Sequence, residues 1–452
     1  MKNNSRRQFI KQSTALGIGT LFMPGFLSNP ASSRLNFAVI GVGGRGKASW
    51  IQLPKDSIVA MCDVDDRMSA DGFSECPRAK RYKDFRKMFD EMGKDIDAVI
   101  VATPDHTHFA AAMAAMELGK HVFVEKPLTH NIWQSRTLKK AAAHYGIVSQ
   151  MGNQGHTTNG IRLVKEWYDA GVLGQVREVI RWSEGLQSDL DSKHYFEKPL
   201  IIPPPAEPIP GGLDWDLWQG PVAERAYNNI YVPRRWRGFY DYGSGKLGDW
   251  ACHTLDAPFW ALELGMPYIV EGESVDPVPD HSFVATESVV TWHFAARGDK
   301  APVTMKWYEG IKKPDIRPEW GIEKLPGNGM IMIGDKKTLI TGGRPNDARL
   351  LVPKEEMDAF LKNAPAQTIP RVDEEKPVKE WIDAIKNNSL PGSNFNYASD
   401  LTEMIQVGVL AQRFGGKLEY NAKKMKIKGR PDLDQYIKEP ARKGWAYGEN
   451  LW

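Results

Sequence analysis

Cysteine, excess charge and long apolar runs are all scarce in this sequence. Only three of its 452 residues are cysteine, and Cys62, Cys76 and Cys252 have no CxxC spacing. This excludes a disulfide framework and a cysteine-based zinc site, and we predict no metal centre. Lysine and arginine number 59 against 56 aspartate and glutamate, which gives a formal net charge of +3. This near balance of positive and negative charges argues against a nucleic-acid-binding surface.

The N-terminal 33 residues contain an apolar stretch that is too short to be a membrane helix. Residues 15–27 are mostly apolar, about a dozen positions where a span needs about 20, so we expect no membrane span in the mature chain. Ser5-Arg6-Arg7-Gln8-Phe9-Ile10-Lys11 precedes this stretch and is a twin-arginine motif. Such motifs direct folded proteins out of the bacterial cytoplasm. We predict a signal peptide over residues 1–33 and a periplasmic or secreted protein; an ordinary secretory signal or an uncleaved anchor is the alternative.

A glycine-rich turn comes after the next apolar run. Gly41-Val42-Gly43-Gly44-Arg45-Gly46 lies directly after residues 35–40, and Asp63 ends a second apolar run, about 20 residues on. The first glycine of such a turn allows a tight bend, the second lets the backbone approach a pyrophosphate, and the third lets a helix pack on the strand. Asp63 can accept hydrogen bonds from both hydroxyls of an adenosine ribose. The pattern predicts NAD; NADP stays possible, because Arg45 or Arg67 could reach a 2′-phosphate.

Polar clusters stand at the ends of the other strands predicted in this half. Residues 97–103 lead into Thr103-Pro104-Asp105-His106-Thr107-His108, residues 121–124 lead into Glu125-Lys126-Pro127, and Asn153 comes after residues 148–151. Ligands of open α/β sheets bind beyond the carboxyl ends of the strands. One edge of the predicted sheet therefore collects the polar clusters of this half.

Beyond residue 150 the alternation of strands and helices gives way to consecutive strands. We predict strands at 175–182, 282–294, 301–308, 329–334 and 338–341, helices at 378–385 and 398–413, and an irregular basic tail after about residue 417. Most of these strands connect without a helix, which indicates an open, mostly antiparallel sheet. The predicted fold is an α/β Rossmann domain over 34–150 and an α+β substrate and oligomerisation domain over 151–452, because one core rarely holds so long a chain.

Three motifs carry a resemblance to a known family. They are the glycine turn, Glu125-Lys126-Pro127 and the segment Gly245-Lys246-Leu247-Gly248-Asp249-Trp250-Ala251-Cys252-His253-Thr254-Leu255-Asp256. Together they resemble the Gfo/Idh/MocA oxidoreductases, which include glucose–fructose oxidoreductase and inositol dehydrogenases. The resemblance runs from about residue 34 to 415. It implies a Rossmann domain, a second domain with an open sheet, and a homodimer or homotetramer.

The resemblance also implies roles for single residues. Lys126 would hydrogen-bond the substrate hydroxyl or share the removal of its proton, and His253 would be the general base or acid. Asp249 lies one helical turn before His253 and would touch a substrate hydroxyl or orient the histidine; Asp256 is a weaker candidate. Trp236 and Arg237 precede this helix and are expected to line the sugar pocket. The cofactor would contact Gly41, Gly43, Gly44, Arg45, Gly46, Asp63, Thr103, Pro104, His108, Glu125, Lys126 and Asn153, with Gln154 as the alternative to Asn153.

These features predict an NAD-dependent oxidoreductase that oxidises a secondary hydroxyl of a sugar or glycoside by hydride transfer to nicotinamide. No free NAD pool is expected outside the cytoplasm, so we expect a tightly bound cofactor that a second sugar or ketone recycles. Two other classes stay open. One is an NAD-dependent glycoside hydrolase that acts by transient oxidation and elimination, an interpretation against which Lys126 weighs. The other is a non-enzymatic sugar or nucleotide sensor, which would lack the lysine or the histidine.

Overall fold

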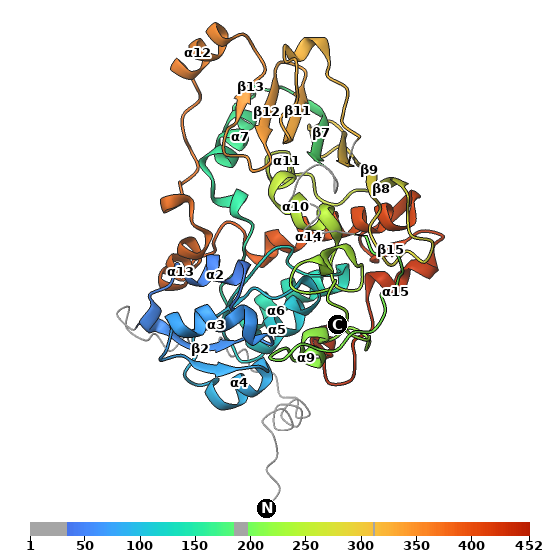
Figure 1. Cartoon of the computed structure of the whole chain (residues 1–452). Coiled ribbons are helices and arrows are strands. Elements are labelled where there is room, and N and C mark those ends of the chain that lie inside the picture. The colour runs from blue at the N-terminus through green and yellow to red at the C-terminus, as the bar shows by residue number, and fades with distance from the viewer. Residues whose placement is uncertain (1–33, 185–197, 311) are drawn as a thin grey trace, which may run out of the picture. The chain divides into compact units, whose positions relative to one another are not determined.

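Two β-sheets organise the chain in the computed structural model, which describes residues 34–184, 198–310 and 312–452. Both sheets belong to one unit that runs from Leu35 to Trp452, and Figure 1 shows helices α10 and α14 between them. The predicted signal peptide, residues 1–33, lies outside the described residues. No helix among the residues described is both long and apolar enough to cross a membrane.

The first sheet has six parallel strands in the order β3-β2-β1-β4-β5-β6. Its two central strands, β1 (Phe37–Ile40) and β4 (Ala98–Val101), consist entirely of buried apolar residues, as expected for a parallel sheet that is covered on both faces. The chain leaves these two strands in opposite directions across the sheet, and a crevice opens where the order reverses. The other strands are β2 (Ile58–Cys62), β3 (Lys80–Tyr82), β5 (His121–Val124) and β6 (Ser149–Met151).

Helices cover both faces of this sheet. They are α2 (Arg45–Trp50), α3 (Asp66–Glu75), α4 (Phe85–Met92), α5 (Asp105–Met116) and α6 (Ile132–Tyr145). The bounds of α6 agree with local signals, since the Asn131 side chain accepts a hydrogen bond from the N–H of Gln134 at its start and Gly146 ends it with a φ of +62°. The alanine-rich α5 is buried almost all around, because its small side chains let the neighbouring elements come close.

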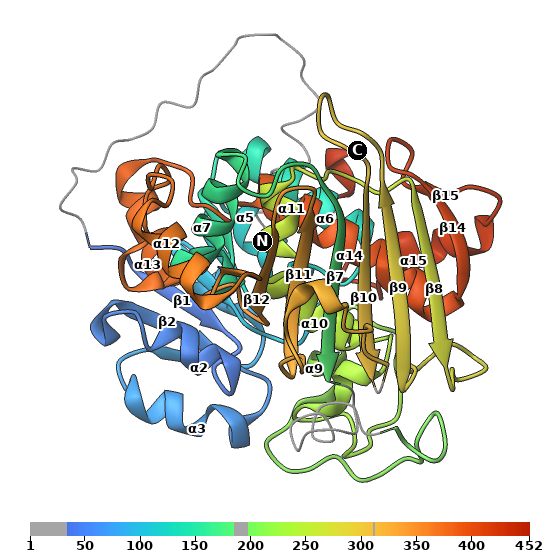
Figure 2. The same ribbon diagram turned by 90° about the horizontal axis from the view of Figure 1, so that it is seen from above.

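The second sheet has nine strands in the order β13-β12-β11-β7-β10-β9-β8-β14-β15, and Figure 2 shows the strands from β12 to β8 side by side. Only the central pair β7 (Val176–Glu184) and β10 (Val303–Gly310) is parallel among the described strand pairs of this sheet, so the predicted antiparallel character is confirmed. The other strands are β8 (Ile269–Val275), β9 (Glu287–Phe294), β11 (Asn328–Gly334), β12 (Thr338–Gly342), β13 (Arg349–Leu350), β14 (Gly416–Asn421) and β15 (Lys426–Ile427).

The prediction of an irregular tail after residue 417 is wrong at its start. Strand β14 pairs with β8, and β15 pairs with β14, at one edge of the second sheet. Leu418 and Tyr420 are buried, while Lys417 and Glu419 before and between them are exposed. This alternation, with a period of two, was the available signal for a half-buried strand.

The long helix α14 (Phe395–Phe414) joins the two halves. It packs against strands β8 and β9 on one side and against α6 on the other, where the Ser135 hydroxyl donates to the carbonyl oxygen of Ser399 at 2.9 Å. Helix α10 (Gly245–Thr254) packs against α14 and faces the crevice of the first sheet. The remaining helices are α7 (Asn159–Asp169), α9 (Trp215–Gln219), α11 (Asp256–Ala261), α12 (Lys354–Lys362), α13 (Pro377–Asn387) and α15 (Asp434–Ile437).

Candidate active site

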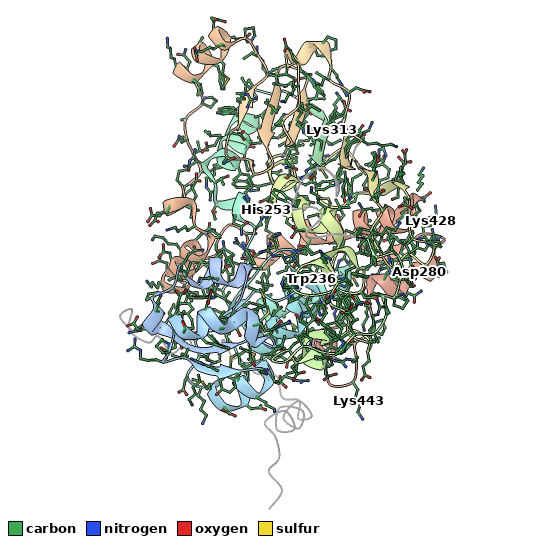
Figure 3. The ribbon with its side chains drawn as sticks, in the orientation of Figure 1. Trp236, His253, Asp280, Lys313, Lys428 and Lys443 are labelled. Atoms are coloured by element: carbon green, nitrogen blue, oxygen red, sulfur yellow. The ribbon has the colours of Figure 1, made fainter. Side chains whose placement is uncertain are left out.

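A cavity of about 540 Å³ lies at the carboxyl ends of the strands of the first sheet. Helix α10 and the loop after β12 close it from the side of the second sheet, and Figure 3 shows His253 and Trp236 in this middle region of the molecule. The cavity brings together most of the residues predicted from the sequence: Gly41, Gly43, Gly44, Arg45, Asp63, Thr103, Pro104, Glu125, Lys126, Trp236, Arg237, Asp249 and His253.

The glycine turn has the geometry that the pattern predicts. Gly41 has a φ of +87°, and a Cβ at this position would lie 2.5 Å from the carbonyl oxygen of Ala102. A Cβ at Gly46 would lie 1.9 Å from the carbonyl oxygen of Gly41, so this glycine packs inside the turn and does not line the cavity. A Cβ at Gly44 would meet no atom within 4 Å. The turn is therefore closed toward the protein and open toward the cavity, as a pyrophosphate-binding turn must be.

Asp63 stands beside this turn at the end of β2. Its Oδ2 accepts hydrogen bonds from the N–H groups of Val42 at 2.8 Å and Gly43 at 3.3 Å, and its Oδ1 accepts one from the N–H of Asp65 at 3.0 Å. Burial raises its pKa, although these three hydrogen bonds act in the opposite direction. The carboxyl group is thus fixed at the edge where an adenosine ribose would lie.

Both arginines that could have selected NADP are held in ion pairs. The Arg67 guanidinium lies 2.6 Å from Asp65. The Arg45 Nε donates to Oε1 of Glu125 at 3.0 Å, and the Ser49 hydroxyl donates to the same oxygen at 2.7 Å. A 2′-phosphate would therefore meet the carboxylates of Asp63 and Asp65, with both of these arginines already paired, which favours NAD.

Replacing Asp63 by serine is expected to weaken NAD binding about ten- to a hundredfold, because charge-assisted hydrogen bonds to the ribose hydroxyls are lost. NADP binding should change little or improve, since a negative charge is removed. Titration of each dinucleotide against tryptophan fluorescence measures both affinities. Asp71→Ser on the exposed side of α3 is the matched control. An unchanged NAD affinity in Asp63→Ser would contradict this role.

Lys126 and Asp249 form an ion pair in the wall of the cavity. Their side chains are 12% and 14% exposed, and the Lys126 ammonium also donates to the backbone carbonyl of Asp249 at 3.1 Å. The Arg237 Nε lies 3.7 Å from the same carboxylate. Burial alone would raise the pKa of Asp249, but the charges of Lys126 and Arg237 lower it to about 2. The carboxylate is therefore ionised and holds the lysine in place.

His253 lies one turn after Asp249 on α10 and is 1% exposed. Burial lowers its pKa well below 6.5, and the nearby charges of Lys126 and Arg344 act in the same direction. The Trp250 ring packs edge-on against the imidazole, with 5.8 Å between the ring centroids. Its Nδ1 is buried and has no hydrogen-bond partner among the described residues. A neutral imidazole in this position can accept a proton.

Besides Gly46, two further predicted cofactor residues do not line the cavity. The ring nitrogens of His108 lie 2.8 Å from the carbonyl oxygens of Pro127 and of Thr103, so this buried histidine braces two strand ends, and burial lowers its pKa to about 4. Asn153 donates to Asp256 at 2.9 Å and accepts from the Ser393 hydroxyl at 2.6 Å. Gln154, the alternative to Asn153, does line the cavity.

The weaker candidate Asp256 also belongs to the protein interior. It accepts from Asn153, and His156 Nδ1 lies 3.0 Å from its Oδ2. His156 is only 2% exposed, so this pair lies in the protein interior.

Several cavity residues were missed in the sequence. Asp105 lines the cavity at the start of α5, and burial raises its pKa to about 7; it belongs to the strand-end cluster from Thr103 to His108, but no role was predicted for it. Trp218, Trp445 and Arg344 also line the cavity. They come from helix α9, the loop after β12 and the C-terminal segment, and no sequence pattern connects these segments to the glycine turn.

Buried polar atoms without a partner among the described residues test whether NAD fits here. Such atoms in residues that line the cavity include Thr103 Oγ1, Glu125 Oε2, His253 Nδ1 and both amide atoms of Gln154. Leaving such atoms unpaired is costly, so a polar ligand in the cavity would stabilise them. Asp63 would hold the adenosine ribose, the glycine turn the pyrophosphate, and the ends of β4 and β5 the nicotinamide half. The residues present fit NAD.

The fold and the site place this chain in the class of NAD-binding oxidoreductases, and the comparison with known families supports the same class. Residues 35–153 match the model described as "Oxidoreductase family, NAD-binding Rossmann fold", and residues 160–293 match "Oxidoreductase family, C-terminal alpha/beta domain". More particularly, the chain belongs to the Gfo/Idh/MocA family.

Each of three curated relatives matches only part of this chain. A levoglucosan dehydrogenase of Pseudarthrobacter phenanthrenivorans is 28% identical over 155 residues, 31% of this chain and 39% of that protein. The NAD-dependent scyllo-inositol 2-dehydrogenase of Bacillus subtilis is 30% identical over 30% of this chain and 41% of its own. A glycosyl hydrolase family 109 protein of Saccharopolyspora erythraea is 29% identical over 32% of this chain and 34% of its own. The matched stretches thus span at most about two fifths of these relatives.

Solved structures share the fold over most of the chain. The WlbA dehydrogenase of Bordetella pertussis, in complex with NADH and UDP-GlcNAcA, has a TM-score of 0.57 at 15% identity and covers 85% of this chain and 98% of its own. An inositol dehydrogenase homologue of Azotobacter vinelandii, in complex with NADH and myo-inositol, has a TM-score of 0.57 at 18% identity, with 86% and 98% covered.

Proposed function

We propose that this protein oxidises a secondary hydroxyl of a sugar or glycoside, with NAD⁺ as the hydride acceptor. The observation that carries the proposal is the convergence of the Lys126–Asp249 ion pair and the neutral His253 on one wall of the dinucleotide cavity. Four tryptophans also line this cavity, namely Trp218, Trp236, Trp250 and Trp445. Their flat rings suit the apolar faces of a sugar.

In this mechanism the protein positions a positive charge beside the substrate hydroxyl and removes one proton from it. The Lys126 ammonium donates a hydrogen bond to the substrate hydroxyl oxygen and stabilises the negative charge that develops there. His253 accepts the hydroxyl proton as a general base. Asp249 holds Lys126 at the required position. Asp63 and the glycine turn would hold NAD⁺, which would supply the hydride acceptor for the carbon that carries the hydroxyl.

The names of the relatives support this substrate class, since one is a levoglucosan dehydrogenase and another a scyllo-inositol dehydrogenase. The test is a spectrophotometric screen of sugars, polyols and glycosides for reduction of nicotinamide. We expect reduction by at least one secondary alcohol of this class. No reduction by any of them would contradict the proposal.

We further propose export by the twin-arginine route with the cofactor tightly bound, because that route carries folded proteins. The motif at Arg6 and Arg7 supports this. Changing both arginines to lysine should leave the protein in the cytoplasm, whereas the unchanged chain should appear in the periplasmic or secreted fraction. Fractionation and immunoblotting measure this. Equal export of both forms would contradict the twin-arginine route.

A further inference from the structure

Arg344 lies in the wall of the cavity and differs from the other cations at the catalytic end. Lys126 and Arg237 each lie within 4 Å of Asp249, and Arg45 pairs with Glu125. The Arg344 guanidinium has no carboxylate or hydrogen-bond partner among the described residues and lies 5.5 Å from the centroid of the Trp250 ring. The residue is exposed, and its side chain borders the space where the substrate would bind.

The loop that carries Arg344 is fixed on both sides of it. The carbonyl oxygen of Gly343 accepts from the Thr254 hydroxyl at 2.6 Å, and that of Pro345 accepts from the Thr158 hydroxyl at 3.2 Å. A Cβ at Gly160 would lie 1.8 Å from the Pro345 carbonyl oxygen, so the backbone of α7 packs directly against the loop. The guanidinium is therefore presented from a defined backbone position, unlike that of an arginine in an unrestrained surface loop.

The electrostatic neighbours of Arg344 place it near the reacting groups. Partial burial lowers its pKa, Arg45 lowers it further, and Asp249 and Glu125 act in the opposite direction. Its own charge acts on His253. None of the acidic residues at the adenosine end of the cavity, Asp63, Asp65 and Asp84, contributes to its pKa. Arg344 thus lies among charged groups of both the glycine turn, which carries Arg45, and the catalytic wall, which carries Asp249 and His253.

We propose that Arg344 binds a carboxylate of the substrate, and that the substrate is therefore a uronic acid or a uronate glycoside. This inference rests on the proposed function and narrows its substrate class. The planar guanidinium offers parallel N–H donors that match the two oxygens of a carboxylate. A sugar carboxylate a few bonds from the oxidised carbon would occupy the same wall as Lys126 and His253.

The test compares acids with uncharged analogues of nearly equal shape. D-glucuronate, D-galacturonate and their methyl glycosides are each paired with the corresponding methyl ester and with the parent hexose. Steady-state kcat/KM is measured for the NAD-loaded full-length enzyme, for Arg344→Gln, for Arg344→Lys and for the control Arg349→Gln, an exposed arginine five residues on. NAD affinity of each variant is measured separately without sugar, by titration against tryptophan fluorescence.

We expect the unchanged enzyme to prefer at least one acid over its ester. Arg344→Gln should lower kcat/KM for that acid about a hundredfold and for its ester less than about threefold, with NAD affinity unchanged. Arg344→Lys should recover only part of the loss, and Arg349→Gln should match the unchanged enzyme.

Equal losses for acid and ester would contradict the inference, and so would weaker NAD binding, which would assign Arg344 to the cofactor pyrophosphate. Turnover of neutral sugars with no preference for acids would overturn this inference alone, whereas no turnover of any sugar would overturn the proposed function.

Discussion

Replacing Lys126 by methionine is expected to lower kcat for sugar oxidation about a thousandfold, within the range for loss of a group that handles a proton or developing charge. Methionine keeps much of the length of the side chain but cannot donate to the substrate oxygen. NAD affinity should change little, since Asp63 and the glycine turn are untouched. Initial rates of nicotinamide reduction and dinucleotide titration measure the two effects.

The ion pair complicates this variant, because Lys126→Met leaves the Asp249 carboxylate without the lysine. The double variant Lys126→Met/Asp249→Asn removes both charges and should restore any lost stability without restoring activity. Lys443→Met, at an exposed lysine labelled in Figure 3, is the matched control and should be fully active. An active Lys126→Met enzyme, or activity regained in the double variant, would contradict a role of the ammonium in catalysis.

Replacing His253 by glutamine is expected to lower kcat/KM about a hundred- to a thousandfold, because the general base is lost. The pH profile adds a readout that a purely structural histidine would not move. Only neutral His253 can accept a proton, and burial lowers its pKa well below 6.5. As pH falls through 6.5, kcat/KM of the unchanged enzyme should therefore stay level and should fall only at more acidic pH.

In His253→Gln this acidic decrease should disappear along with most of the activity. His144→Gln, at an exposed histidine near the end of α6, should keep both the rate and the profile of the unchanged enzyme. The contradicting result would be an acidic decrease in kcat/KM whose midpoint lies at or above pH 6.5 and which is absent in His253→Gln. It would show that burial does not keep the histidine neutral.

The sequence predicted best those features that depend on neighbouring residues. Helix α6 (Ile132–Tyr145) is bounded by such local signals, its N-cap Asn131 and its final Gly146. The glycine turn and Asp63 could be placed for the same reason, since the turn and two parallel strands fix their geometry. Lys126, Asp249 and His253 were proposed together only through a family resemblance, and the fold brings them to one cavity.

The predicted residues that do not line the cavity, and the cavity residues that were missed, depend on long-range packing. His108 and Asn153 do come after strand ends, but a strand end does not determine which way each side chain points, and both turn to buried partners. Arg344 reaches the site only because β12 lies beside β11 in the second sheet and its loop packs on α7 and α10. Trp445 arrives from the C-terminal segment. No pattern within a short window of sequence contains these contacts.

The similarity to a glycosyl hydrolase family 109 protein supports one alternative, an NAD-dependent glycoside hydrolase. Both reactions would begin with oxidation of a sugar hydroxyl by bound NAD⁺. They differ in the next step, since a hydrolase eliminates the glycosidic substituent and returns the hydride. Net reduction of nicotinamide and release of an aglycone are therefore the quantities that separate them.

The most direct test of the central claim uses protein purified without added nucleotide. Part of it is denatured and the released dinucleotide is identified by mass spectrometry, while the native protein is mixed with sugars, uronates and chromogenic glycosides. Absorbance of reduced nicotinamide and free aglycone are recorded together. We predict bound NAD(H), sugar-dependent reduction and no aglycone release. Bound NAD⁺ with aglycone release and no net reduction would contradict an oxidoreductase and establish a hydrolase.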